Sequence, residues 1–109
     1  MEMTVRQEER CLEIALIGEL DHHAAREIGG RLDRAIEAAL PLRLGLFPCE
    51  KLVLDLSELT FMDSSGIAVV MRVRQRVRDL GGAVTLRGVR PQARKVLDAA
   101  GLDRFVTVE

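Results

Sequence analysis

The alternation of apolar and polar residues predicts extended strands near both ends of the chain and in its middle. Five segments either alternate in this way or form a short apolar run, namely residues 3–6, 12–17, 52–56, 83–86 and 105–108. Leu12, Ile14 and Leu16 would share one face of a hairpin whose strands are joined by the polar residues 8–10. Residues 52–56 are apolar except for Asp55, as expected for a central strand covered on both faces. Asp55 should therefore lie at a strand end or beside a polar partner.

A second kind of segment carries apolar residues at every third or fourth position, which is the spacing of an amphipathic helix. The first such helix follows Gly18, and Asp21 is its natural N-cap. Its apolar positions are Ala24, Ile28, Leu32, Ala35, Ile36, Ala39 and Leu40. Gly29 and Gly30 lie in its interior and cost up to about 1 kcal/mol each relative to alanine, which indicates a helix middle that is soft or closely packed.

The most regular helix begins at Ser64. Its apolar stripe comprises Ile67, Val70, Val73, Val77 and Leu80, and Gly81 and Gly82 end it. A third helix is predicted over residues 91–100, with proline in its first turn and Gly101 at its end. Residues 41–48, which begin and end with proline, are expected to form a loop that packs against the protein.

The predicted order of elements is β-β-α-β-α-β-α-β. After the opening hairpin, strands alternate with helices, so right-handed crossovers would build a mixed, largely parallel sheet with helices packed against it. The chain has 109 residues, of which 48% are apolar and only 3% aromatic, so its core must be mainly aliphatic. We therefore expect one α/β domain over residues 1–109.

Charge and cysteine content narrow the classes of partner. The net charge of -1 gives no general attraction to nucleic acid or to anionic membranes. Cys11 and Cys49 are far apart and form no redox or zinc motif. No apolar run approaches the roughly 18 to 20 residues of a membrane span, and no glycine pattern matches a phosphate-binding loop. These features predict a cytoplasmic protein that needs no cofactor and contacts neither membrane nor nucleic acid directly.

The main candidate for function lies between the central strand and the second helix, where loops are presented on a rigid scaffold. This segment reads Phe61-Met62-Asp63-Ser64-Ser65-Gly66. Asp63, Ser64 and Ser65 are all good N-cap residues, so capping alone is one interpretation. In the other, a hydroxyl accepts a phosphoryl group, because a helix N-terminus offers unsatisfied amides and partial positive charge. The phosphate would add roughly 1.5 to 2 negative charges beside Asp63, and Gly66 would let another protein's active site approach.

A second polar cluster precedes the first helix and is expected at the same edge of the sheet. It reads Gly18-Glu19-Leu20-Asp21-His22-His23. We expect no metal there, because adjacent histidines point in different directions and no ligand-spaced cysteine supports them. A hydrolase built from Ser64, Asp21 and His22 or His23 lacks a G-x-S-x-G elbow and room for an enclosed pocket, so we assign no catalytic residue. Capping residues and surface histidines are the plainer interpretation.

Four arginines follow one another along the second helix, at Arg72, Arg74, Arg76 and Arg78. Such a series is usually a solvated face, and docking of a partner is the alternative. At about 100° per residue the four spread around much of the helix, and no aromatic residues lie between them for base stacking, which disfavours nucleic acid.

The two clusters together resemble the STAS-domain anti-sigma factor antagonists, and most closely those of stage II sporulation. The resemblance rests on residues 18–23 and on Leu54-Asp55-Leu56-Ser57 running into residues 61–66, in that order. It extends to Gly81-Gly82 before a strand and to Val96-Leu97-Asp98-Ala99-Ala100-Gly101-Leu102, so it covers nearly the whole chain.

This resemblance implies a partner-switching cycle. The unphosphorylated antagonist would bind an anti-sigma factor that is also a serine kinase and so release a sigma factor. Phosphorylation of Ser64 would end the interaction, and a metal-dependent serine phosphatase would restore it. ATP, magnesium and the general base would belong to the kinase, so this chain would not itself be an enzyme. The implied partner-binding residues are Glu19, Asp21, His22, His23, Met62, Asp63, Ser64, Ser65 and Gly66.

Two other functions stay open at this point. The fold-level resemblance also fits a STAS scaffold or ligand-binding subunit of a stress-sensing or lipid-transport complex, in which Ser64 would merely cap a helix. The remaining alternative is the small serine hydrolase that uses Ser64 with His22 or His23.

Overall fold

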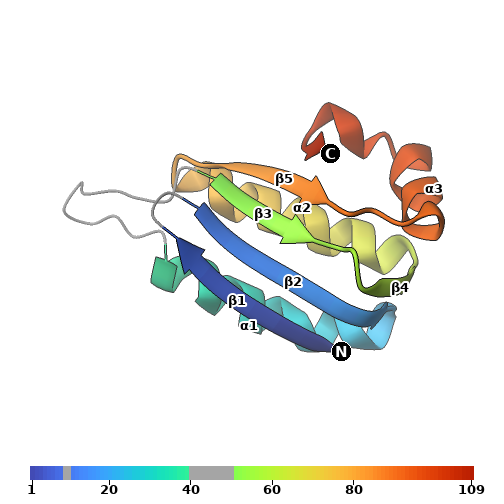
Figure 1. The fold of residues 1–109 in the computed structure, drawn as a ribbon, viewed down its shortest axis with the longest axis horizontal. Helices are drawn as coiled ribbons and strands as arrows, with labels where there is room; N and C mark the ends of the chain where they lie inside the picture. Colours follow the sequence, from blue (N-terminus) through green and yellow to red (C-terminus); the bar gives the residue numbers. More distant parts are fainter. Residues whose placement is uncertain (9–10, 40–50) are drawn as a thin grey trace.

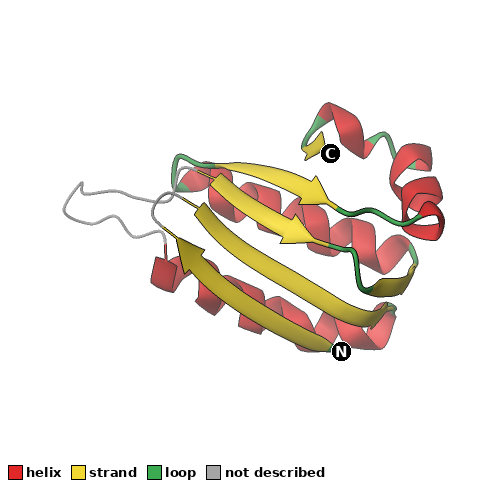
Figure 2. Cartoon of the chain, in the orientation of Figure 1, coloured by secondary structure: helices red, strands yellow, loops and turns green. Residues whose placement is uncertain are grey.

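The computed structural model describes residues 1–8, 11–39 and 51–109, and within them six strands form one mixed sheet (Figures 1 and 2). The strands are β1 (Glu2–Glu8), β2 (Cys11–Leu20), β3 (Lys51–Asp55), β4 (Leu59–Met62), β5 (Ala83–Arg87) and β6 (Thr107–Val108). The helices are α1 (His22–Ala39), α2 (Ser64–Asp79), α3 (Pro91–Ala99) and the 3₁₀ helix η1 (Leu102–Arg104). The predicted α/β class with a mixed sheet is confirmed.

The order of strands across the sheet is β1-β2-β3-β5-β6, with β4 paired to β2 outside this path. Only the opening pair β1 and β2 is antiparallel among the described strands, and the other pairs are parallel. The long strand β2 serves two neighbours, since it pairs with β3 from Cys11 to Ala15 and with β4 from Gly18 onward. The register shifts between Gly18 and Glu19, where Gly18 has φ of 113°, a conformation that glycine adopts without strain.

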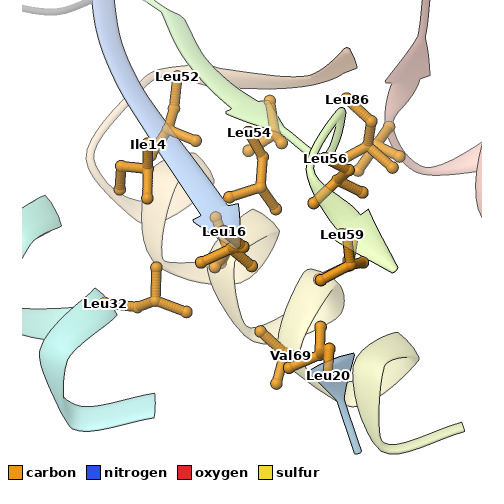
Figure 3. Packing of buried hydrophobic residues seen from close by; sticks show 14 of the residues in the cluster. Ile14, Leu16, Leu20, Leu32, Leu52, Leu54, Leu56, Leu59, Val69 and Leu86 are labelled. Atoms are coloured by element: carbon orange, nitrogen blue, oxygen red, sulfur yellow. The ribbon is translucent and has the colours of Figure 1, made fainter. Parts of the chain in front are cut away.

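Helices α1 and α2 lie side by side behind the sheet and cover one of its faces (Figure 1). The inward face of β2 carries Leu12, Ile14 and Leu16, all fully buried as the alternation predicts. Strand and helix side chains meet in one aliphatic cluster, part of which is drawn in Figure 3. Each fully buried side chain of this size contributes roughly 1.5 to 3 kcal/mol, so this cluster is what fixes both helices to the sheet.

Ion pairs across the surface join the two helices. Arg72 contacts Asp33 through Nε at 3.2 Å and Nη2 at 2.5 Å, and Arg76 reaches both Asp33 and Glu37. The hydrogen bond from Arg72 holds the pKa of Asp33 below its ordinary value of 3.8. At these two positions the exposed arginines of the series form ion pairs with carboxylates of α1. These ion pairs tie α2 to α1.

Replacement of Asp33 by asparagine is expected to lower the thermal midpoint at pH 7 but to have a smaller effect at pH 3. The pKa of Asp33 is lowered on folding, so its carboxylate stabilises the fold above the ordinary value of 3.8 and loses this effect as pH falls through the folded pKa. Thermal unfolding of Asp33→Asn and of Glu37→Gln, which breaks one exposed pair, provides the measurement and its control. An equal loss at both pH values would contradict this reading.

The last residue of β5, Arg87, forms ion pairs with two carboxylates on the other face of the sheet. Arg87 Nη2 lies 2.7 Å from Glu13 and 3.0 Å from Asp55, and Asp55 also accepts a bond from the Ser57 N–H at 2.9 Å. Burial raises the pKa of Asp55, but the hydrogen bonds from Ser57 and Arg87 outweigh it and the net shift is downward. The expectation that Asp55 has a polar partner at a strand end is confirmed.

Several predicted boundaries need correction. Strand β4 was not predicted, because its burial pattern of two exposed residues between buried Leu59 and Met62 shows no alternation. The last strand shrinks to Thr107–Val108, since η1 occupies the preceding turn. Leu80 is the C-cap of α2 and 43% exposed, while Val69 takes a place in the buried stripe instead. Residues 9–10, 40 and the predicted loop 41–48, like Cys49, lie outside the described residues.

Candidate functional site

The two polar clusters meet where β2 and β4 end. Glu19 pairs with Phe61 and Leu20 with Met62 in parallel register, and the Asp63 N–H donates to the Leu20 carbonyl at 3.4 Å. Because the two strands run in parallel, the helices that follow them begin at the same edge of the sheet (Figure 1). The prediction that residues 18–23 and 61–66 share one edge is confirmed.

Aspartates cap both helices. Asp21 Oδ1 accepts a hydrogen bond from the Ala24 N–H at 2.9 Å, as predicted. Asp63 has extended backbone angles of −117° and −167°, and its Oδ1 accepts from the Ser65 N–H at 2.8 Å. Asp63 is therefore the N-cap of α2 and Ser64 is the first helical residue. This geometry chooses one cap among the three candidates of the sequence.

Because Asp63 caps α2, the Ser64 side chain is not needed as a cap. This side chain is exposed, and within residues 1–8, 11–39 and 51–109 its hydroxyl forms no hydrogen bond. It lies at a helix N-terminus, where backbone amides and the helix dipole favour negative charge. The start of α1 on the same edge adds a second set of such amides. The hydroxyl is thus accessible and its surroundings tolerate an anion.

Met62 and Gly66 support Ser64 from inside the protein. Both are buried, and a Cβ added to Gly66 would lie 2.5 Å from Met62 Cγ and 3.1 Å from Leu20 Cδ2. The prediction that Met62 contacts a partner is therefore corrected, because its side chain has no exposed surface. Gly66 is needed for close packing against Met62, and not to let another active site approach.

Phe61 is the residue of this segment that the sequence interpretation missed. It is 38% exposed and lies on β4 opposite Glu19, which is also exposed. Its neighbour Met62 is fully buried, so the two adjacent residues differ in what they offer to a partner. No sequence pattern separates the two, because Leu59 and Met62 are buried while the two residues between them are exposed.

A shallow groove of about 270 Å³ runs between the first halves of α1 and α2. Its lining comprises His22, Ala25, Arg26, Gly29, Ser65, Ala68, Val69 and Arg72. Gly29 is buried in this groove, and a Cβ on it would lie 3.0 Å from Arg72 Nη1, which favours close packing in the middle of α1. The groove thus joins the polar cluster before α1 to the serine segment of α2.

The two histidines lie at this surface without converging on a ligand set. His22 lines the groove, and both His22 and His23 are exposed. Among the residues that the structure describes, no group of three or more histidine, cysteine or carboxylate side chains is arranged to hold a metal ion.

Comparison with known proteins identifies the family, since the model of the STAS domain matches residues 2–109. The chain belongs to the STAS-domain family. An anti-sigma F factor antagonist from Paenibacillus polymyxa is 33% identical over 95 residues, which cover 87% of this chain and 74% of the relative. Another from Lysinibacillus sphaericus is 31% identical and covers 94% of this chain and 78% of the relative. The chain therefore stands among the anti-sigma factor antagonists of the STAS family.

Solved structures agree with this assignment. The anti-sigma factor antagonist SpoIIAA in its unphosphorylated form superposes with a TM-score of 0.76 at 27% identity, over 99% of this chain and 88% of that one. The Bacillus cell fate determinant SpoIIAA in the phosphorylated form gives 0.67 at 28% identity, over 99% and 91%. The predicted STAS fold is confirmed. No helix in the described part of the chain is long and apolar enough to cross a membrane.

Proposed function

We propose that this STAS protein is a phosphorylation-controlled antagonist whose unphosphorylated form binds an anti-sigma factor with serine kinase activity and so releases a sigma factor. Phosphorylation of Ser64 switches this binding off. The observation that carries the proposal is that Asp63, and not Ser64, is the N-cap of α2. Asp63 caps α2, so the neighbouring Ser64 hydroxyl is exposed and free of structural hydrogen bonds to the described residues.

The surroundings of Ser64 support a switch in binding and not in folding. A phosphate on the first residue of α2 would lie at the positive end of the helix dipole, where anions are stabilised. The same group adds roughly 1.5 to 2 negative charges to a surface that had presented a neutral hydroxyl. A partner surface complementary to the neutral form would meet both extra charge and extra volume.

The surface offered to the partner combines the groove with the exposed residues around it. Glu19, His22, His23, Phe61 and Ser64 are exposed, and Asp21, Asp63 and Ser65 are partly so. Met62 and Gly66 shape this surface from below. Ser65 lines the groove and directly follows Ser64 in the chain, so the groove lies beside the proposed switch residue.

The remaining parts of the cycle belong to other proteins. The kinase supplies ATP, magnesium and the base that takes the serine proton, and this chain is its substrate. A metal-dependent serine phosphatase resets the switch. We place this cycle in the cytoplasm, where sigma factors act. The relatives named as anti-sigma F factor antagonists support this assignment over a hydrolase or a transporter subunit.

Incubation of the protein with its anti-sigma kinase and ATP, followed by mass mapping of the peptides, tests the proposal. We expect one phosphate, on Ser64. A protein that takes no phosphate, or takes it on Ser65 or elsewhere, would exclude Ser64 as the switch.

Phe61→Ala is expected to weaken binding of the anti-sigma factor at least about tenfold while the thermal midpoint changes little. A half-exposed aromatic beside the switch residue is the type of side chain that dominates binding energy at interfaces. Phe105→Ala is the matched control, because Phe105 is similarly exposed, at 44%, but packs against Arg74 near the C-terminal end of α2. Binding of Phe61→Ala at wild-type strength would remove Phe61 from the interface.

A further inference from the structure

One side chain of helix α3, Gln92, forms two hydrogen bonds with the backbone of strand β4. Its Nε2 donates to the Met62 carbonyl at 2.8 Å, and its Oε1 accepts from the Met62 N–H at 2.8 Å. Backbone N–H and C=O groups of successive residues point to opposite sides of an extended chain. The Asp63 N–H bonds to β2, so the N–H and C=O groups of Met62 point away from β2. The amide of Gln92 therefore occupies the free edge of β4 as a neighbouring strand would.

The residue that Gln92 holds, Met62, packs beneath the helix turn that carries Ser64. Met62 lies two positions before Ser64, and its side chain packs directly under the first turn of α2 at Gly66. Gly66 leaves no space for adjustment, because an added Cβ would lie 2.5 Å from Met62 Cγ. A shift of the Met62 backbone would therefore move Asp63 and the start of α2 with it.

Gln92 is free to act on β4 because it has no capping role in its own helix. The N-cap of α3 is Arg90, which makes no side-chain capping bond, and Pro91 follows with no N–H to satisfy. The amide of Gln92 makes both of its hydrogen bonds to a residue 30 positions earlier in the chain. The contact joins the C-terminal part of the chain to the serine segment.

We propose that Gln92 is a positioning residue for phosphorylation, which holds the β4–α2 junction so that the Ser64 hydroxyl is presented in one orientation. This inference rests on the proposed function, because it assumes that Ser64 is the phosphoryl acceptor. Gln92 does not touch the kinase-bound phosphate in this account. It acts through Met62.

Kinetics of phosphorylation separate positioning from docking. In Gln92→Met, which keeps the length of the side chain but removes both hydrogen bonds, we expect the kcat for Ser64 phosphorylation to fall about fivefold to tenfold. The KM should change less than about twofold, because the groove and Phe61 are untouched. Gln92→Glu should be intermediate, since its carboxylate accepts from the Met62 N–H but cannot donate to the Met62 carbonyl.

Gln75→Met is the matched control. It makes the same chemical change on α2, where the Gln75 amide donates to Asp79 at 2.8 Å on the exposed surface. We expect wild-type kcat and KM from it. A second measurement needs no kinase: hydrogen exchange of the Met62 amide should become faster in Gln92→Met while amides of β2 and β3 keep wild-type protection.

The outcomes are distinguishable. Absence of phosphate on Ser64 in the wild-type protein would defeat the proposed function. Hydrogen exchange of the Met62 amide would still test whether Gln92 holds the Met62 backbone. A wild-type kcat in Gln92→Met with phosphate on Ser64 would overturn this inference alone. A fall in kcat that merely follows a general loss of protection throughout the sheet would overturn it as well, because it would assign Gln92 a structural role only.

Discussion

Ser64→Asp is expected to weaken binding of the anti-sigma factor at least about tenfold while the protein stays as stable as the wild type or becomes slightly more stable. The two effects have opposite signs for a physical reason. An acidic residue in the first turn of a helix gains about 0.3 to 1 kcal/mol from the helix dipole. At an interface that had accepted a neutral hydroxyl, the same charge weakens the binding free energy by several kcal/mol, because it meets like charge or loses its water.

Binding by calorimetry and thermal unfolding of the same samples give the two quantities. Gln75→Glu, which adds one negative charge elsewhere on α2, should bind normally. Ser64→Ala should bind like the wild type and take no phosphate, whereas Ser65→Ala should still be phosphorylated on Ser64. A Ser64→Asp protein that binds with wild-type affinity, or that loses binding only because it unfolds, would contradict the switch.

Gly66→Ala is expected to destabilise the protein clearly, although it adds only one methyl group to the site. The new Cβ would be placed 2.5 Å from Met62 Cγ and 3.1 Å from Leu20 Cδ2, so buried side chains must leave their positions. Overpacking of this kind costs about 1 to 3 kcal/mol. For a domain of this size each kcal/mol lowers the thermal midpoint by several degrees.

A double substitution identifies the cause of that loss. Met62→Ala alone creates a cavity and is also destabilising, but together with Gly66→Ala it removes the clash. The two losses should therefore add to more than the loss of the double variant. Additive losses, or a Gly66→Ala protein as stable as the wild type, would show that the contact with Met62 does not determine the choice of glycine.

The repeating elements could be predicted from the sequence because burial alone determines their pattern. Leu12, Ile14 and Leu16 alternate on one face of a strand, and Val70, Val73 and Val77 recur at helical spacing. Strand β4 has neither property. It is four residues long, and only its pairing with the end of β2 makes it a strand. Local periodicity cannot report a contact that forms between distant segments.

At the site, too, the sequence indicated only what depends on neighbouring residues or on the direction of the strands. Three neighbouring residues were equally suitable as helix caps, and only the backbone angles and hydrogen bond of Asp63 separate the cap from Ser64. The shared edge of the two clusters was predictable, because parallel strands end on the same side of a sheet. The burial of Met62 and the contact from Gln92 depend on tertiary packing, so neither had a sequence signal.

The central claim is that one phosphate on Ser64 ends binding, and the most direct measurement is the affinity of the same protein before and after that modification. Wild-type protein phosphorylated by the kinase and purified to a single phosphate on Ser64 should bind the anti-sigma factor at least about tenfold more weakly than the untreated protein. Its thermal midpoint should not fall. Phosphatase treatment should restore the affinity. Equal affinities of the two forms would contradict the account.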